Sequence, residues 1–128
     1  MQQRISTLPR LGDPTLLRAQ AYVAGVWCDG AEGKFPVNNP ADGGLLAEAA
    51  NCGAADARRA IDAAARAMPA WRAKTAKERA VILRRWFELI MAAQEDLAQL
   101  MTAEQGKPLA EARGEIAYGA SFVEWFAE

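Results

Sequence analysis

Histidine is absent from this sequence of 128 residues. Its absence excludes Ser-His-Asp and Cys-His nucleophile pairs, and it excludes most zinc sites. Cysteine occurs only at Cys28 and Cys52, and two isolated thiols fit a reduced cytoplasmic setting better than a disulfide scaffold. Cys52 just precedes an expected helix, where a thiol can be activated. Because neither thiol has a histidine partner, an inert loop thiol is the favoured interpretation for both.

The sequence also lacks a strong excess of charge and any long hydrophobic run. The formal net charge is −1, and no basic patch is interleaved with aromatic residues, so we expect no nucleic-acid partner. No run approaches the roughly 20 apolar residues of a membrane span, and residues 1–10 lack the apolar core of a secretory signal. Gly106-Lys107 is followed by Pro108 and lacks the upstream glycine of a P-loop.

The first third of the chain has the pattern of short antiparallel strands. Residues 1–20 are expected to form a flexible arm, with a short helix near residues 14–19. Strands are predicted at residues 21–24, 26–28, 35–38 and 45–50, because apolar and β-branched runs there are separated by turn residues. Gly25 lies where a tight turn or bulge would fall between the first two strands.

The remainder of the chain is predicted to form three to four helices, which makes the fold class α+β. A first helix follows Gly53 and is expected to stop or kink at Pro69. Thr75 and Glu78 fit a capping box at the start of a long helix, which is expected to bend near residues 93–94 before it continues. Gly106 suits a helix end and Pro108 the start of the last helix.

Two groups of side chains are candidates for a functional role. Glu104 extends the apolar stripe of Leu97, Leu100 and Met101, and it could bind a cation or anchor the Gly106 turn. A carboxylate at the rim of the core, paired with Lys107 or Arg113, is the favoured interpretation. The aromatic group of the last helix could line a ligand tunnel, but an aromatic stripe at helical spacing is more often core. Its members are Tyr118, Phe122, Trp125 and Phe126.

Several segments, in order along the whole chain, resemble the aldehyde dehydrogenase family. Residues 22–27 (YVAGVW) resemble its opening strand, and residues 39–43 (NPADG) resemble its N-P-(A/S)-(T/N)-G turn. Residues 67–71 (AMPAW), followed by Arg79, resemble its A-x-x-A-W helix pair, and residues 104–108 (EQGKP) match its (E/D)-x-G-K-P junction. Residues 76–79, 83–86 and 122–128 are most similar to the succinate-semialdehyde dehydrogenase branch, with glutarate-semialdehyde dehydrogenases a close second.

This resemblance implies an NAD(P)-dependent enzyme that oxidises an aldehyde substrate, here succinate or glutarate semialdehyde, to the acid. It implies that residues 21–128 are the N-terminal portion of the cofactor-binding domain, truncated and incomplete without a downstream Rossmann-type sheet. The family's catalytic cysteine, general-base glutamate, oxyanion-hole asparagine and cofactor segment do not map onto this sequence. We therefore expect no catalytic, cofactor-binding or metal-binding residue in the chain, no cofactor bound by it alone, and no activity on its own.

Two minor roles do map by resemblance. Glu115, Gly119 and Phe122 share one helical face that borders the substrate tunnel in related enzymes. Val37, Asn38 and Glu104 correspond to a region that holds a structural monovalent cation in some members.

The alternative to a dehydrogenase segment is a non-enzymatic helical module that self-associates or binds a partner through Trp86, Phe122, Trp125 and Phe126. In either case exposed apolar surface predicts a homo-oligomer, not a clean monomer.

Overall fold

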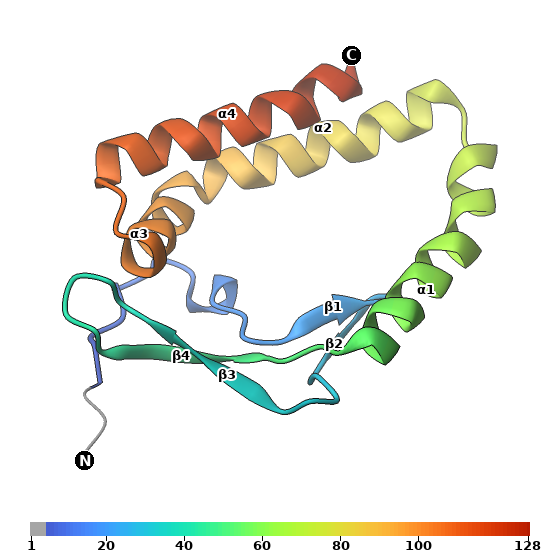
Figure 1. Ribbon diagram of the computed structural model, residues 1–128. Coiled ribbons are helices and arrows are strands. Elements are labelled where there is room, and N and C mark those ends of the chain that lie inside the picture. Colours follow the sequence, from blue (N-terminus) through green and yellow to red (C-terminus); the bar gives the residue numbers. More distant parts are fainter. Residues whose placement is uncertain (1–4) are drawn as a thin grey trace.

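The structure, a computed structural model, describes residues 5–128 and confirms an α+β fold of short strands followed by helices. Figure 1 shows the strands on one side of the molecule and two antiparallel helices, α2 and α4, along the other, with α1 and α3 joining the two sides. The elements in chain order are η1 (Pro14–Leu16), β1 (Ala21–Val23), β2 (Val26–Cys28), β3 (Lys34–Asn38), β4 (Leu45–Ala50), α1 (Ala54–Ala73), α2 (Ala76–Ala92), α3 (Gln94–Gln105) and α4 (Leu109–Ala127).

The strands form two separate antiparallel pairs, β1–β2 and β3–β4. Ala24 and Gly25 join β1 to β2 with φ values of 53° and 83°. Two successive residues with positive φ make the tight turn whose twist suits a two-residue hairpin. The turn predicted at Gly25 is therefore confirmed, and Tyr22 lies directly opposite Trp27 across the hairpin.

The N-terminal segment contacts both the strands and α3. The Ser6 amide donates to the Leu45 carbonyl at 3.0 Å, and the amides of Gly12 and Asp13 each donate to an Asp96 carboxylate oxygen at 2.9 Å. The expected short helix is a single 3-10 turn that ends at Leu16. Residues 1–4 of the predicted arm lie outside the described residues, and the flexibility of the arm stays a prediction.

Helix α1 does not stop at Pro69, so that half of the prediction was wrong. Pro69 lies inside the helix, which continues to Ala73 and ends where Lys74 adopts an extended conformation. Proline lacks the amide that would donate one hydrogen bond within the helix. The helix nevertheless continues on both sides of Pro69. At the other end of α1, the buried Asp56 carboxylate accepts the Ala31 amide at 2.9 Å and ties α1 to the β2–β3 connection.

The helix boundaries in the second half follow the predicted capping residues. The Thr75–Glu78 capping box is present at the start of α2, and the expected bend at residue 93 is a break between α2 and α3. Gly106 ends α3 in the left-handed conformation, with φ 80° and ψ 8°. Pro108 is the N-cap of α4, one position before the helix itself.

The buried apolar side chains of residues 5–128 are small. They are Leu46, Ala98, Ala112, Ala120 and Ala127. Several large apolar side chains on α2 and α4 are instead half exposed or more. Within the described residues, no helix is long and apolar enough to cross a membrane.

Candidate functional site

Helix α4 carries the candidate tunnel residues, and the Gly106 turn sets its direction. After the left-handed Gly106, Lys107 and Pro108 lead into Leu109, so α4 runs back antiparallel to α2 (Figure 1). A Cβ atom at Gly106 would lie 2.9 Å from Pro40 Cγ, so the turn also approaches the β3–β4 connection closely. This close contact and the positive φ both require glycine.

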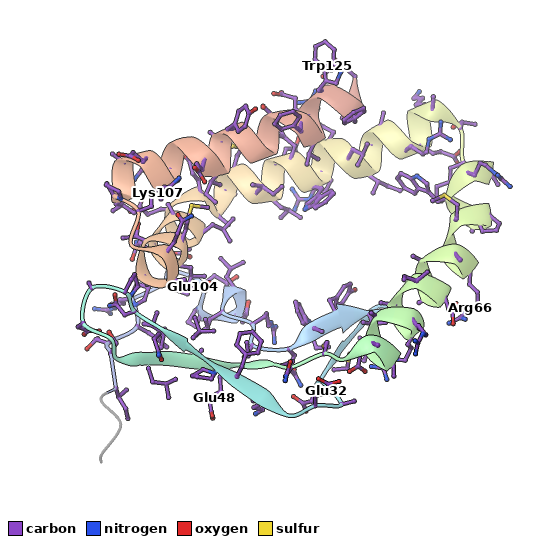
Figure 2. All side chains as sticks on the ribbon, viewed as in Figure 1. Glu32, Glu48, Arg66, Glu104, Lys107 and Trp125 are labelled. Carbon is purple, nitrogen blue, oxygen red and sulfur yellow. The ribbon has the colours of Figure 1, made fainter. Side chains whose placement is uncertain are left out.

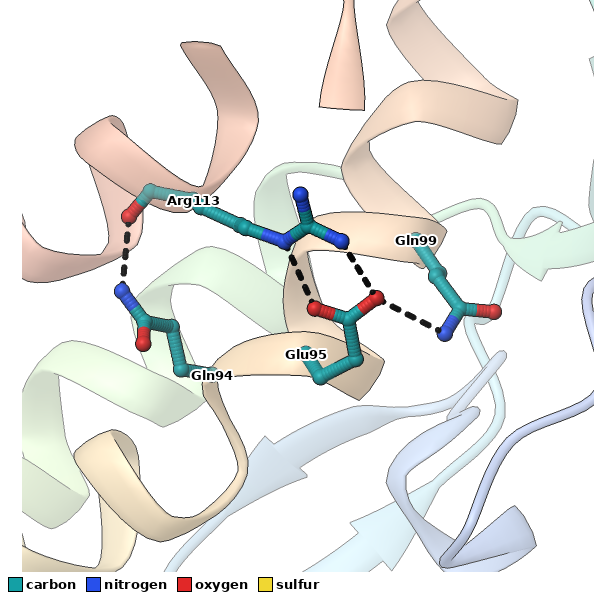
Figure 3. Close-up of polar contacts among 4 residues, drawn as sticks. All are labelled: Gln94, Glu95, Gln99 and Arg113. Carbon is teal, nitrogen blue, oxygen red and sulfur yellow. Dashed lines mark hydrogen bonds and ion pairs between the residues drawn. The ribbon is translucent and has the colours of Figure 1, made fainter. Parts of the chain in front are cut away.

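A polar cluster joins the start of α3 to the first turns of α4 (Figure 3). Arg113 Nε and Nη2 donate to the Glu95 carboxylate at 2.7 and 2.9 Å, and Gln94 Nε2 donates to the Arg113 carbonyl at 3.0 Å. The hydrogen bonds from Arg113 lower the pKa of Glu95, and the Glu95 carboxylate raises the pKa of Arg113. Sequence spacing does not predict this pair, because the two residues are 18 positions apart on different helices.

Three further ion pairs hold α4. Arg84 of α2 donates to Glu124 at 2.8 Å and also pairs with Glu128, which fixes the last turn of α4 against α2. Lys107, in the connection before α4, pairs with Glu115. The carboxylate of Glu115 is therefore compensated by a neighbouring cation, although sequence analysis had not linked these two residues.

The three candidate tunnel residues share an exposed side of α4. Glu115, Gly119 and Phe122 are all exposed, whereas Ala120, which points away from this face, is buried. Nothing lies within 4 Å of a Cβ built at Gly119, so the surface beside Phe122 is open. The structure thus brings these residues together on one face, and their role at a tunnel stays a prediction.

The interpretation of the aromatic group as core was wrong. Its side chains are between 50% and 74% exposed, and Figure 2 shows Trp125 pointing away from the rest of the molecule. Tyr118 and Phe122 contact each other edge to face, with ring centroids 4.9 Å apart. At the end of α4, a wide surface hollow of about 700 Å³ is lined by Phe122, Trp125 and Phe126, among others. The buried side chains of α4 are alanines, and its aromatic side chains remain exposed.

The candidate cation residues are only partly assembled. Val37 and Glu104 line the same small cavity, of about 120 Å³, whereas Asn38 is not among its lining residues. Glu104 is exposed, and the favoured pairing with Lys107 or Arg113 was wrong, because those cations pair with Glu115 and Glu95. Within residues 5–128 no group of three or more acidic or cysteine side chains could hold a metal ion.

The two thiols are far from α4. Cys28 is half buried at the end of β2, where its Sγ lies 3.5 Å from the Ala21 carbonyl oxygen and 3.7 Å from Arg59 Nη2. Cys52 is exposed in the loop before α1. The two thiols are free and form no disulfide with each other.

The sequence of this chain is similar to those of known proteins of one family. The aldehyde dehydrogenase family model matches residues 27–128. Glutarate-semialdehyde dehydrogenase of Pseudomonas aeruginosa is 61% identical over 120 residues, which cover 93% of this chain and 25% of that protein. The NADP(+) succinate-semialdehyde dehydrogenase GabD of Escherichia coli is 60% identical over 120 residues, with the same two shares.

A solved structure of the same family is similar to this chain in its fold. The crystal structure of aldehyde dehydrogenase from Brucella melitensis matches with a TM-score of 0.90 at 55% identity, over 94% of this chain and 25% of that one. The chain thus spans about a quarter of the length of the relatives that it matches. Since the family match covers most of the chain, the resemblance found in the sequence is confirmed, and the chain belongs to the aldehyde dehydrogenase family.

Proposed function

We propose that this chain is a segment of an NAD(P)-dependent semialdehyde dehydrogenase whose whole form oxidises succinate semialdehyde to succinate. The observation that carries the proposal is the 60% identity to the Escherichia coli succinate-semialdehyde dehydrogenase. A second candidate substrate is glutarate semialdehyde, because the Pseudomonas aeruginosa glutarate-semialdehyde dehydrogenase is equally similar. The two substrates differ by one methylene, which an apolar pocket distinguishes by only about 10- to 200-fold.

The contribution of this chain is a wall of the substrate tunnel. Glu115, Gly119 and Phe122 lie at i, i+4 and i+7 on the exposed side of α4, which supports that role. Phe122 would supply apolar surface, and Gly119 would leave room beside it. Because Lys107 compensates the Glu115 carboxylate, this wall would not repel a substrate that carries a carboxylate.

The nucleotide cofactor has no counterpart among the described residues. A dinucleotide site of the Rossmann type needs parallel strands whose ends meet a glycine-rich turn and a helix N-terminus. Residues 5–128 instead carry two antiparallel strand pairs, and they do not fit that group. We therefore assign no cofactor contact and no chemical step to this chain, and we expect it to be inactive alone.

A structural monovalent cation near Val37, Asn38 and Glu104 is a further part of the proposal. Its support is that Val37 and Glu104 line one cavity. In the whole enzyme, Na⁺ should raise Tm above its value in a choline buffer, and Glu104→Gln should remove that increase. A Tm that is equally sensitive to Na⁺ in both proteins would rule this cation site out.

The proposed whole enzyme is cytoplasmic and homo-oligomeric. The free thiols Cys28 and Cys52 support the first point, since a reducing compartment keeps such thiols unpaired. The exposed apolar side chains of α2 and α4 support the second.

The test is a hybrid enzyme in which this chain replaces the matching quarter of the Escherichia coli protein. We expect turnover of succinate semialdehyde with NADP⁺ by the hybrid and none above background by the chain alone. A folded hybrid without activity would count against the proposal, and turnover by the isolated chain would refute its expected inactivity. The ratio of kcat/KM for the two semialdehydes in the hybrid, against that of the parent, measures how far this segment selects between them.

Within that hybrid, Phe122→Ala tests the tunnel wall. We expect KM to rise about 10-fold, because truncation removes apolar contact area from the bound aldehyde. Ser121→Ala, at the neighbouring exposed position, is the matched control and should leave KM unchanged. Equal effects of the two substitutions would contradict a wall that includes Phe122.

A further inference from the structure

One side of α4 carries two ion pairs that join this helix to α2 and α3. Arg113 pairs with Glu95 of α3 (Figure 3), and Glu124 pairs with Arg84 of α2. Arg113, Ala120 and Glu124 lie at i, i+7 and i+11, a spacing that places residues on one side of a helix. Ala120, between the two ion pairs, is only 1% exposed. This side, which we call the anchor side, therefore faces the other helices of the chain.

The candidate tunnel residues Glu115, Gly119 and Phe122 form a second side of α4, which we call the tunnel face. Successive residues of an α-helix are turned by about 100°, so Glu124, two positions after Phe122, points about 160° away from it. The tunnel face and the anchor side are thus nearly opposite each other. The ion pairs of the anchor side can affect the tunnel face only through the position and rotation of the whole helix.

Small side chains make up the buried part of α4. The buried residues of this helix are Ala112, Ala120 and Ala127. Small side chains let two helices approach closely, but they do not interlock with the neighbouring helix as large side chains do. Ile116 and Val123 of the same helix are only half buried. The rotation of α4 about its own axis therefore depends strongly on the ion pairs of the anchor side.

Arg84 is the centre of a network of contacts with α4. Its Nη1 donates to Glu124 Oε1 at 2.8 Å, and it also pairs with Glu128, one turn further along the same helix. Its guanidinium lies 5.5 Å from the centre of the Phe87 ring. A single exposed ion pair contributes little, whereas several charges in one network can hold a defined geometry. Arg84 is thus the residue of α2 that is best placed to fix the rotation of α4.

We propose that Arg84 is a positioning residue. Through its ion pairs with α4 it sets the rotation of that helix, which determines how far Phe122 closes the tunnel and therefore which length of semialdehyde the enzyme prefers. The inference rests on the proposed function, because it assigns a source of selectivity to the same tunnel wall. A misplacement on the order of 1 Å can change turnover 100-fold. Without the ion pairs of Arg84, α4 can turn away from the substrate and leave room for one more methylene.

The experiment compares substitutions of Arg84 and Arg85 in the hybrid enzyme. Arg84→Met keeps an unbranched apolar side chain and removes the ion pairs with α4. We expect it to raise the ratio of kcat/KM for glutarate semialdehyde over succinate semialdehyde about 5-fold, which is part of the roughly 10- to 200-fold discrimination that one methylene allows. Glu124→Gln should shift this ratio in the same direction, and Arg84→Lys, which keeps the charge, should restore most of it.

Arg85→Met is the matched control. The Arg85 side chain is 68% exposed and pairs, at 3.5 Å, with Glu88 of its own helix. We expect Arg85→Met to leave the ratio of the two kcat/KM values unchanged. The ratio also distinguishes positioning from a loss of stability. A substitution that only destabilises the fold lowers the amount of active enzyme, which reduces both rates equally.

Hydrogen exchange of the α4 amides in the isolated chain is a second measurement, which needs no turnover. Amides of a helix that is held less firmly exchange faster, because the helix opens more often. We expect faster exchange in α4 with Arg84→Met and unchanged exchange with Arg85→Met. Unchanged exchange with Arg84→Met would refute the role of Arg84 in holding α4.

The outcomes separate this inference from the proposed function. If Phe122→Ala raises KM but Arg84→Met and Glu124→Gln leave the ratio unchanged, the positioning role is overturned and the tunnel wall stands. An equal shift of the ratio with Arg85→Met also overturns it. If Phe122→Ala leaves KM unchanged for both semialdehydes, the tunnel wall is refuted instead, and with it the effect of Arg84 on selectivity.

Discussion

Gly106 is the residue at which the chain reverses between α3 and α4. Its φ is +80°, a conformation that costs other residues about 1–2 kcal/mol. A Cβ atom there would also lie 2.9 Å from Pro40 Cγ. Gly106→Ala should therefore lower the free energy of unfolding by about 1–3 kcal/mol, measured by urea denaturation.

Gly114→Ala is the control for this prediction. Gly114 lies inside α4, and nothing lies within 4 Å of a Cβ built there. Alanine is a better helix former than glycine, so the substitution should raise the free energy of unfolding by about 0.5–1 kcal/mol. Destabilisation by both substitutions would mean that glycine at residue 106 has no special conformational role.

Glu95 should give the stability of the chain a dependence on acidic pH. Arg113 lowers the pKa of Glu95 in the folded state, so the carboxylate stabilises the fold above its unfolded pKa. This contribution is lost as the pH falls through the lowered folded pKa. We expect Glu95→Gln to lower Tm at pH 7 by a small amount, and the difference from the unmodified chain to vanish in strong acid.

The Glu95 measurement has an internal control in Glu88. Glu88 makes one contact with Arg85, at 3.5 Å, in place of the two short hydrogen bonds of Glu95. Exposed ion pairs of that kind contribute little to stability. Glu88→Gln should change Tm less than Glu95→Gln at pH 7. A Tm difference for Glu95→Gln that persists unchanged into strong acid would contradict the role of its charge.

At the residue scale, the ion-pair partners of charged side chains could not be predicted from the sequence. Lys107 was expected beside Glu104, its near neighbour in sequence, but it pairs with Glu115. The choice depends on the direction in which α4 leaves the Gly106 turn, which no sequence spacing specifies. Local capping residues were predicted correctly, because a cap involves only residues three or four positions apart.

At the scale of elements, the capping box at the start of α2 is the feature whose contribution to stability is most directly tested by substitution. The Thr75 hydroxyl accepts the Glu78 amide, and the Glu78 carboxylate accepts the Thr75 amide at 2.7 Å. Thr75→Ala should lower the free energy of unfolding by about 1 kcal/mol. The hydrogen bonds from Thr75 also lower the pKa of Glu78, so the cost of Thr75→Ala should shrink as the pH falls below the ordinary range for glutamate.

Ser121→Ala controls for the removal of a hydroxyl from an exposed helical position. Ser121 Oγ donates to the Tyr118 carbonyl within α4, and within residues 5–128 it makes no hydrogen bond to another element. Loss of the Ser121 hydroxyl should leave the free energy of unfolding, measured by urea denaturation, nearly unchanged. If Ser121→Ala were as costly as Thr75→Ala, the effect at residue 75 could not be attributed to capping.

The elements themselves were predictable, but the side of α4 that is buried was not. Strands, turns and caps follow from short sequence patterns, and those at Gly25, Thr75 and Gly106 are confirmed. The aromatic stripe of α4 was assigned to the core because large apolar side chains usually are buried. In the structure Ala112 and Ala120 are buried instead. The sequence pattern shows which residues share a side, and it does not say whether the partner of that side is in the same chain.

At the scale of the whole molecule, the chain has exposed apolar helix faces and a core of small side chains. Ile82, Trp86 and Leu89, exposed together on one side of α2, offer an apolar surface on which copies of the chain can pack against each other. We therefore expect a mass well above 13.8 kDa by light scattering, rising with concentration. Trp86→Asp should shift the distribution toward the monomer, and Val81→Asp should not. A monomeric mass for the unmodified chain at working concentration would refute this prediction.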